Sequence, residues 1–152
     1  MSPEADLRIL AVEVQIMDAI EPQGGTVLLD VMSGEGEFDK SFLERVGHPV
    51  TVCNGPDVGA VCPLLGGEGC PKYEEAHGIV FELDLDRSQH RAIVERYRQL
   101  GREDLPIRVV VRPGQREAYA DLLAQVQVWE HEPTVADLDG FAAQVEASDR
   151  FA

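Results

Sequence analysis

Three cysteines and one histidine fall within a short stretch in the middle of the chain. Cys53, Cys62, Cys70 and His77 have the spacing Cys-x8-Cys-x7-Cys-x6-His. Three thiolates and one imidazole make a structural zinc site, and thiolates also hold iron–sulfur clusters. Cys62 and Cys70 are each followed by proline, as at many cluster ligands. The four residues are therefore the predicted metal ligands, with zinc or an iron–sulfur cluster as cofactor.

Other interpretations of the same residues remain open. The spacing lacks the tight Cys-x2-Cys pair of strong metal motifs. Cys53 can instead be a small apolar residue at a strand end, with Cys62 and Cys70 as loop thiols or as a disulfide. An oxidation response is a further reading of this loop. His90 is expected on a helix surface, and no Gly-x-Ser-x-Gly nucleophile motif is present.

The charge balance limits the partners that the chain can bind. Its 152 residues include 28 acidic and 13 basic side chains, for a net charge of -15. Nucleic acids and membrane surfaces are themselves negative, so neither is an expected partner. The sequence has no basic leader and no apolar run of about 20 residues, which predicts a cytoplasmic protein with reduced thiols.

Short apolar segments alternate with helical patterns from residue 26 onward. Strands are expected over 27–31, 50–53, 79–83, 107–111 and 126–129. Helices are expected over 37–46, 88–100, 115–124 and 134–147, with a short one over 71–76. Strands that alternate with helices predict an α/β fold with a five-stranded parallel sheet, doubly wound by right-handed crossovers.

Two domain-level segments follow from this pattern. Residues 1–25 form an expected helical extension, because apolar residues recur at helical spacing over 3–20, although 7–14 can also be read as a strand. Residues 26–152 form the α/β domain, with a cysteine-containing insert at 53–77 after the second strand. A loop of that length inside a compact domain is typical of a functional segment.

Individual elements carry more specific predictions. Phe38, Phe42 and Val46 share one face of the helix expected over 37–46. Thr134 and Asp137 have the spacing of a capping box at the start of the last helix. Trp129 ends the last strand and is expected to pack at a sheet edge.

The order of elements over residues 26–147 resembles that of response-regulator receiver domains, which have the flavodoxin-like fold. A local match is the last strand followed by Glu132-Pro133 and a terminal helix, where receivers carry Lys-Pro. The resemblance implies a signalling module that binds a protein partner.

Four positions depart from the receiver pattern. Asp30 lies inside the first strand instead of in an acidic pair behind it, and Glu82 or Asp84 stands at the phospho-acceptor position. Arg112 replaces the hydroxyl residue, and Glu132 replaces the lysine that contacts the phosphoryl group. Phosphoryl transfer needs that positive charge. The implied function is a non-catalytic, degenerate receiver that cannot run the usual phosphorylation cycle.

Polar residues at the strand ends are expected to form one rim. Asp30, Glu82, Asp84, Arg112 and His131 follow or end strands, and the carboxyl ends of parallel strands meet at one edge. This acidic rim repels flavin phosphates. Its carboxylates can hold magnesium or lie solvated, some paired with Arg112. Metal binding or oxidation in the cysteine loop would alter the rim, and a partner protein would recognise the altered surface.

An enzyme is the alternative function. Residues 27–36 resemble the strand-to-glycine loop of S-adenosylmethionine-dependent methyltransferases, which implies that Asp30, Gly34 and Gly36 bind the cofactor. Met32 stands where that family commonly has another glycine, and the second strand ends without the acid that binds the ribose. Two glycines in a turn are also explained by the turn alone.

Overall fold

The computed structural model of the chain describes residues 24–56 and 62–150. These residues form the expected α/β fold around a parallel sheet of order β2-β1-β3-β4-β5. The strands are β1 (Val27–Asp30), β2 (Val50–Cys53), β3 (Gly78–Phe81), β4 (Ile107–Val110) and β5 (Gln127–Trp129). The predicted helix over 3–20 lies outside the described residues.

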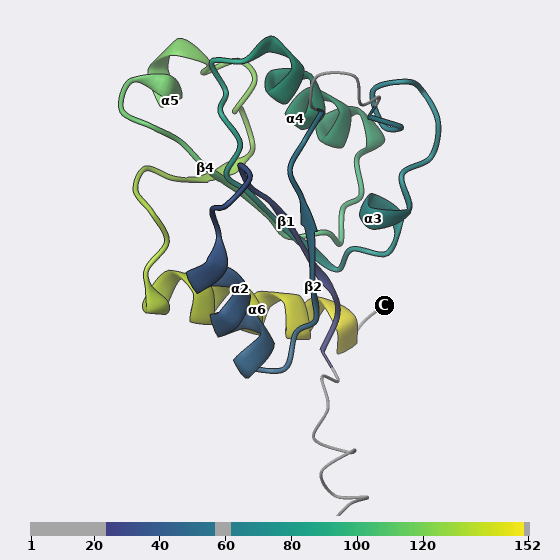
Figure 1. Cartoon of the computed structure of the whole chain (residues 1–152), viewed down its shortest axis with the longest axis vertical. Coiled ribbons are helices and arrows are strands. Elements are labelled where there is room, and N and C mark those ends of the chain that lie inside the picture. Colours follow the sequence, from purple (N-terminus) through teal and green to yellow (C-terminus); the bar gives the residue numbers. More distant parts are fainter. Residues whose placement is uncertain (1–23, 57–61, 151–152) are drawn as a thin grey trace, which may run out of the picture.

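Helices cover both faces of the sheet (Figure 1). One face carries α2 (Glu37–Arg45) and α6 (Val135–Arg150), and the other carries α3 (Pro71–Glu74), α4 (Ser88–Leu100) and α5 (Gln115–Ala118). This is the doubly wound, flavodoxin-like arrangement that the sequence predicted, with the cysteine-containing loop after β2. The order changes direction between β1 and β3, where such sheets have their ligand crevice.

Each face of the sheet has its own hydrophobic core. The α4-side core includes Leu28, Ile79, Phe81, Ile93 and Tyr97. The α6-side core includes Val27, Leu29, Leu43, Phe141 and Val145. Alternate residues of β1 point to opposite faces, so this four-residue strand contributes to both cores and is fully buried.

The last helix begins as its sequence predicts. Thr134 Oγ1 accepts a hydrogen bond from the backbone N–H of Asp137 at 3.2 Å, and Asp137 Oδ2 accepts one from the backbone N–H of Thr134 at 2.9 Å. The capping box is therefore present. Trp129, on the edge strand β5, packs edge-on against Phe141 of α6, which confirms its expected position at a sheet edge.

Two helices have features that the sequence did not predict. α5 ends at Ala118, and residues beyond it form turns, because Tyr119 is held to the α4 region by a hydrogen bond to Asp86 and by the Arg91 guanidinium over its ring. In α2 the buried residues are Asp39 and Leu43. The face shared by Phe38, Phe42 and Val46 points largely outward, with Phe38 55% exposed.

Candidate functional site

The carboxyl ends of β1 and β3 place two carboxyl groups in different surroundings. Asp30 ends β1 and Glu82 directly follows β3, whose last residue pairs with Asp30. The backbone N–H of Glu82 donates to the Asp30 carbonyl at 2.6 Å. Asp30 shares the α4 face with Tyr97, whereas Glu82 meets Asp39 of α2 on the other face.

Glu82 and Asp39 form a hydrogen-bonded carboxyl pair. Burial is the largest cause that raises the pKa of Glu82, to about 9, and the hydrogen bond and charge of Asp39 raise it further. The charges of Glu132 and Glu35 act in the same direction. The pKa values of both groups are raised, so the pair retains a proton at neutral pH, mainly on Glu82.

The electrostatics of this pair oppose the binding of a phosphoryl group. Glu132, at the position where receivers carry lysine, adds negative charge to the pair. A phosphoryl group needs cationic or N–H partners, and a protonated carboxyl pair supplies no positive charge. The Glu82–Asp39 pair therefore favours binding a proton over binding a phosphoryl group.

Asp84 belongs to a separate ion pair farther along the same edge. Burial alone would raise its pKa, but the backbone N–H of Asp86 and the Arg112 guanidinium outweigh that effect and lower it. Arg112 Nη1 lies 3.2 Å from Asp84 Oδ2, and Gln115 Nε2 donates to Asp84 Oδ1 at 3.2 Å. The predicted pairing of a rim acid with Arg112 is confirmed.

Asp30 lies beneath the edge and is not part of an exposed rim. Its side chain is 1% exposed, and Tyr97 Oη donates a hydrogen bond to its Oδ2 at 2.6 Å. Burial raises the Asp30 pKa to about 7, although Tyr97 and the Lys72 charge lower it in part. Asp30 is therefore a titrating group near neutral pH inside the α4-side core.

The three cysteines gather on the same side of the sheet as Asp30. Cys53 is paired with Asp30 in the β1–β2 register, and Cys53, Cys62 and Cys70 all pack half-buried against the α4-side core. All three are free thiols. Burial raises the pKa of Cys53, and the nearby negative charges of Asp30 and Cys62 raise it further.

The structure does not bring His77 to Cys53. His77 precedes β3 at the amino edge of the sheet, whereas Cys53 ends β2 at the carboxyl edge. Four residues of strand separate those edges by roughly 13 Å, too far for a shared metal ion. Within residues 24–56 and 62–150, no group of three or more His, Cys, Asp or Glu side chains is placed to hold a metal ion.

The residues of the methyltransferase-like loop have structural roles of their own. Gly34 and Gly36 both have positive φ angles, of 84° and 86°. A Cβ on Gly36 would lie 2.9 Å from Val31 Cγ1. The carboxylate of Asp30 is buried and bonded to Tyr97, which leaves it no exposed oxygen for a cofactor.

Sequence reasoning missed several residues that shape this region. Asp39 and Tyr97 lie on helices, and their spacing gives no sign of a partner on a strand. His90 is 2% exposed and its Nδ1 accepts from the backbone N–H of Asp84 at 3.1 Å, so its predicted surface position is wrong. The turn at Gly55 lies close to the ring, with His90 Nε2 3.3 Å from a Cβ placed on Gly55, and no sequence pattern signals this contact.

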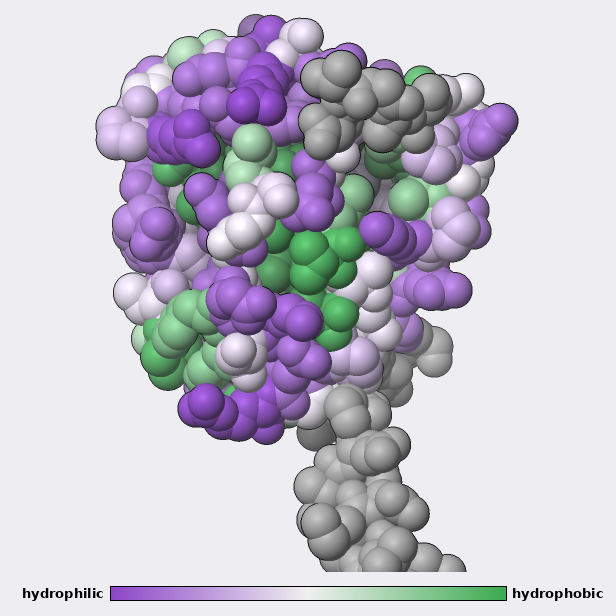
Figure 2. Space-filling model, viewed as in Figure 1, coloured by the Kyte–Doolittle hydropathy of each residue, from purple (hydrophilic) through white to green (hydrophobic). Residues whose placement is uncertain are grey.

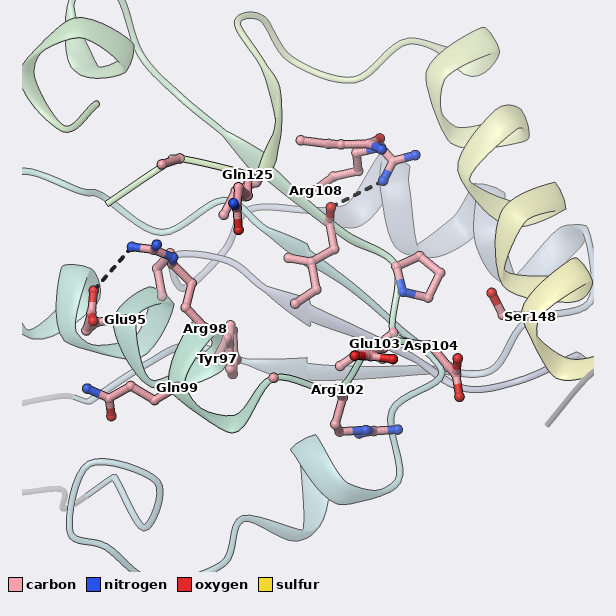
Figure 3. Close-up of a pocket in the computed structure, with 18 of the residues that line it drawn as sticks. Glu95, Tyr97, Arg98, Gln99, Arg102, Glu103, Asp104, Arg108, Gln125 and Ser148 are labelled. Carbon is pink, nitrogen blue, oxygen red and sulfur yellow. Dashed lines mark hydrogen bonds and ion pairs between the residues drawn. The ribbon is translucent and has the colours of Figure 1, made fainter. Parts of the chain in front are cut away.

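An open cavity of about 630 Å³ lies at the amino ends of β4 and β5, and Tyr97 is among the residues that line it (Figure 3). Its arginines already have partners: Arg98 pairs with Glu95, Arg102 donates to the Tyr73 carbonyl, and Arg108 donates to Gln144. In Figure 3 these three side chains point in different directions, so they do not converge on one ligand position.

Comparisons with known proteins give no family. No family model matches the chain. No curated protein matches it either. Among the described residues, no helix combines the length and apolar character needed to cross a bilayer.

Proposed function

We propose that the chain is a non-catalytic regulatory module that binds a protein partner through α2, built as a degenerate receiver-like domain. The observation that carries this proposal is an apolar ridge on α2, made of Phe38, Phe42 and Val46. Phe38 is 55% exposed and Val46 37% exposed, whereas the buried face of the helix holds Asp39 and Leu43. Exposed apolar side chains in a row favour a contact surface.

Neighbouring elements extend the ridge. Val135, 54% exposed, lies at the amino end of α6, which packs beside α2. Val50 and Val52 of the edge strand β2 are half-buried on the same face of the sheet. Figure 2 shows apolar residues gathered over β2, bordered by hydrophilic residues of α2. Exposed apolar side chains on neighbouring elements, with polar residues beside them, are typical of protein interfaces.

The negative charge around the ridge indicates the charge of the partner's surface. Glu37 and Glu44 are exposed on α2 beside the ridge, and the chain has a net charge of -15. A partner with an apolar contact face bordered by Lys or Arg is complementary to this surface, and its association is faster at low salt. We therefore assign the ridge to a separate protein with a basic border.

Regulation in this proposal does not use phosphorylation. The protonated Glu82–Asp39 pair and the negative charge of Glu132 disfavour a phosphoryl group where receivers carry one. A small phosphodonor with Mg²⁺ should leave the intact mass of the protein unchanged. A gain of one phosphoryl group at Glu82 or Asp84 would contradict the degenerate assignment.

The partner contact is tested with a photo-crosslinking residue placed at Phe38, and at Glu44 as the matched control on the polar side of α2. In the producing cell, Phe38 should give one dominant adduct that Glu44 lacks. The identified partner, purified, should bind the protein at least tenfold more weakly after Phe38→Asp and more weakly as salt increases. Equal adducts at both positions, or binding unaffected by Phe38→Asp, would refute the α2 contact.

A further inference from the structure

The α2 ridge lies beside the point where the described part of the chain begins. The backbone N–H of Gly24 donates to the Gly47 carbonyl at 3.0 Å, and Gly47 directly follows Val46, the last residue of the ridge. Gly24 is packed tightly there, because a Cβ on it would lie 2.5 Å from the ring of His48, which is fully buried. In Figure 1 the amino end of β1 and the carboxyl end of α2 lie at the same end of the molecule. Residues 1–23 are therefore joined to the domain next to one end of the ridge.

The sequence of residues 1–23 contains an apolar stripe. Leu7, Leu10, Val14 and Met17 recur at helical spacing. Such a stripe is stable in water only when it packs against another apolar surface. Among the described residues, five large apolar side chains are exposed, and three of them, Phe38, Val46 and Val135, belong to the α2 ridge or to its extension on α6. The surface that best matches the stripe is therefore the one beside which the segment is attached.

The segment is long enough to follow the whole ridge. The chain rises by about 12 Å from Phe38 to Val46, whereas residues 7–20 would extend over about 21 Å as a helix. The connecting residues 21–25, Glu-Pro-Gln-Gly-Gly, contain one proline and two glycines, which favour a reversal of the chain direction. A short connection gives the segment an effective concentration at the ridge in roughly the millimolar range. This exceeds the concentration of a second copy in a micromolar solution.

We propose that residues 7–20 fold back on the α2 ridge of their own chain and cover it until the partner displaces them. This inference rests on the proposed function, because it assigns a competitor to the same contact surface. Residues 1–23 contain five acids and one basic residue, and α2 exposes Glu37 and Glu44, so charge opposes the internal contact. A partner with a basic border has the charge complementarity that the segment lacks, and this allows the partner to displace it.

The test uses the purified full-length protein without a partner. Benzoylphenylalanine, a photo-crosslinking residue that keeps the site apolar, is placed at Phe38 and, as the matched control, at Glu44. After irradiation at micromolar concentration, mass spectrometry of monomer-sized protein should find position 38 joined to residues 7–20, at least about tenfold more than position 44. This crosslink should increase from about 10 to about 200 mM sodium chloride, because screening weakens the repulsion.

Two substitutions in the segment test the stripe. Leu10→Asp should reduce the crosslink at least about fivefold, because it places a charge in the apolar contact. Gln15→Asp adds the same charge outside the stripe and should change the yield less than about twofold. Circular dichroism checks that each variant is folded. Equal yields from the two variants would overturn the role of the stripe.

The remaining outcomes separate this contact from the partner contact. A crosslink from position 38 that occurs only in dimer-sized protein would assign the cover to a second copy, and no crosslink to residues 7–20 would mean that the ridge is open. Either result would overturn the internal contact and leave the partner contact standing, because that contact is tested by the adduct in the producing cell. An internal crosslink in a protein whose position 38 gives no cellular adduct would support the internal contact and refute the partner contact.

Discussion

Asp30 and Glu82 follow neighbouring strands, yet their carboxyl groups have different partners. Asp30 accepts from Tyr97 inside the α4-side core, and Glu82 shares a proton with Asp39 of α2. Both have a folded-state pKa above the ordinary value, at about 7 and about 9. A raised carboxyl pKa means that the folded state binds the proton more tightly than the unfolded chain, so stability falls as pH rises.

Tyr97→Phe tests the buried hydrogen bond. The change removes the Tyr97 hydroxyl that donates to Asp30 Oδ2 and leaves a buried carboxyl oxygen unsatisfied. The free energy of unfolding at pH 7 should fall by about 1–3 kcal/mol, as measured by urea denaturation. Asp30→Asn in the Tyr97→Phe background should restore part of the loss, because an amide carries no charge. A neutral effect of Tyr97→Phe would mean that the bond is not formed.

Glu82→Gln tests the carboxyl pair. Wild-type stability from this group is fully present below the ordinary glutamate pKa of 4.5 and is lost as pH rises through about 9. The Asp30 contribution is largely complete above pH 7, so measurements between pH 7 and 9 isolate Glu82. Glu82→Gln should be more stable than wild type at pH 9, by about 1–2 kcal/mol, and should show a flatter pH dependence.

The matched control for that change is Glu132→Gln, which removes an exposed charge near the pair. It should lower the Glu82 pKa and give a smaller gain in stability. A Glu82→Gln variant that loses stability at pH 9 would show that the carboxylate form is the favoured one.

Among the elements, the turn between β1 and α2 gives a test of backbone conformation. Gly34 and Gly36 both have positive φ angles, but only a Cβ on Gly36 would meet neighbours, with Val31 Cγ1 at 2.9 Å. Gly34→Ala should destabilise the protein by about 1 kcal/mol and Gly36→Ala by about 2–3 kcal/mol. Equal losses of unfolding free energy in the two variants, measured by urea denaturation, would mean that Val31 moves away from the new Cβ at no cost.

The strands were predictable to within one or two residues because each is a short, mostly apolar run in a parallel sheet. The length of α5 was not predictable from the sequence. Its helical pattern continues past Tyr119, whereas the helix ends at Ala118, where the Tyr119 hydroxyl bonds to Asp86. The burial of Asp39 on the inward face of α2 was not predictable for a similar reason. Its buried residues include Asp39, whose partner Glu82 is distant in sequence, and no local pattern signals that contact.

The candidate site was predictable only where topology alone decides it. Parallel strands bring Glu82, Asp84 and Arg112 to one edge, as expected. The burial of the Asp30 carboxyl group depends on its hydrogen bond to Tyr97. The sequence pattern indicates only that Tyr97 is a core residue of α4. His77 was grouped with the cysteines by sequence proximity, although the strand register puts it at the other edge.

At the scale of the whole molecule, the edge strand β2 contributes side chains to both faces of the sheet. Its alternate side chains face opposite sides of the sheet, with Val50 and Val52 toward the α6-side core and Cys53 toward the α4-side core. The outer carbonyl of Val52 accepts from Lys72, so α3 covers part of this edge (Figure 1). The strand β2 therefore connects the α4-side core with the face that carries α2 and α6.

The net charge of -15 predicts how the whole molecule responds to salt. The described ion pairs between Lys or Arg and carboxylates are largely exposed, as in Lys40–Glu44 and Arg116–Glu130, and each contributes little. Repulsion among the excess carboxylates therefore outweighs the attraction lost by screening. Raising sodium chloride from about 10 to about 200 mM at pH 8 should increase Tm by several degrees. Potassium chloride should act equally, because screening depends on ionic strength, and a fall in Tm would show that the ion pairs dominate.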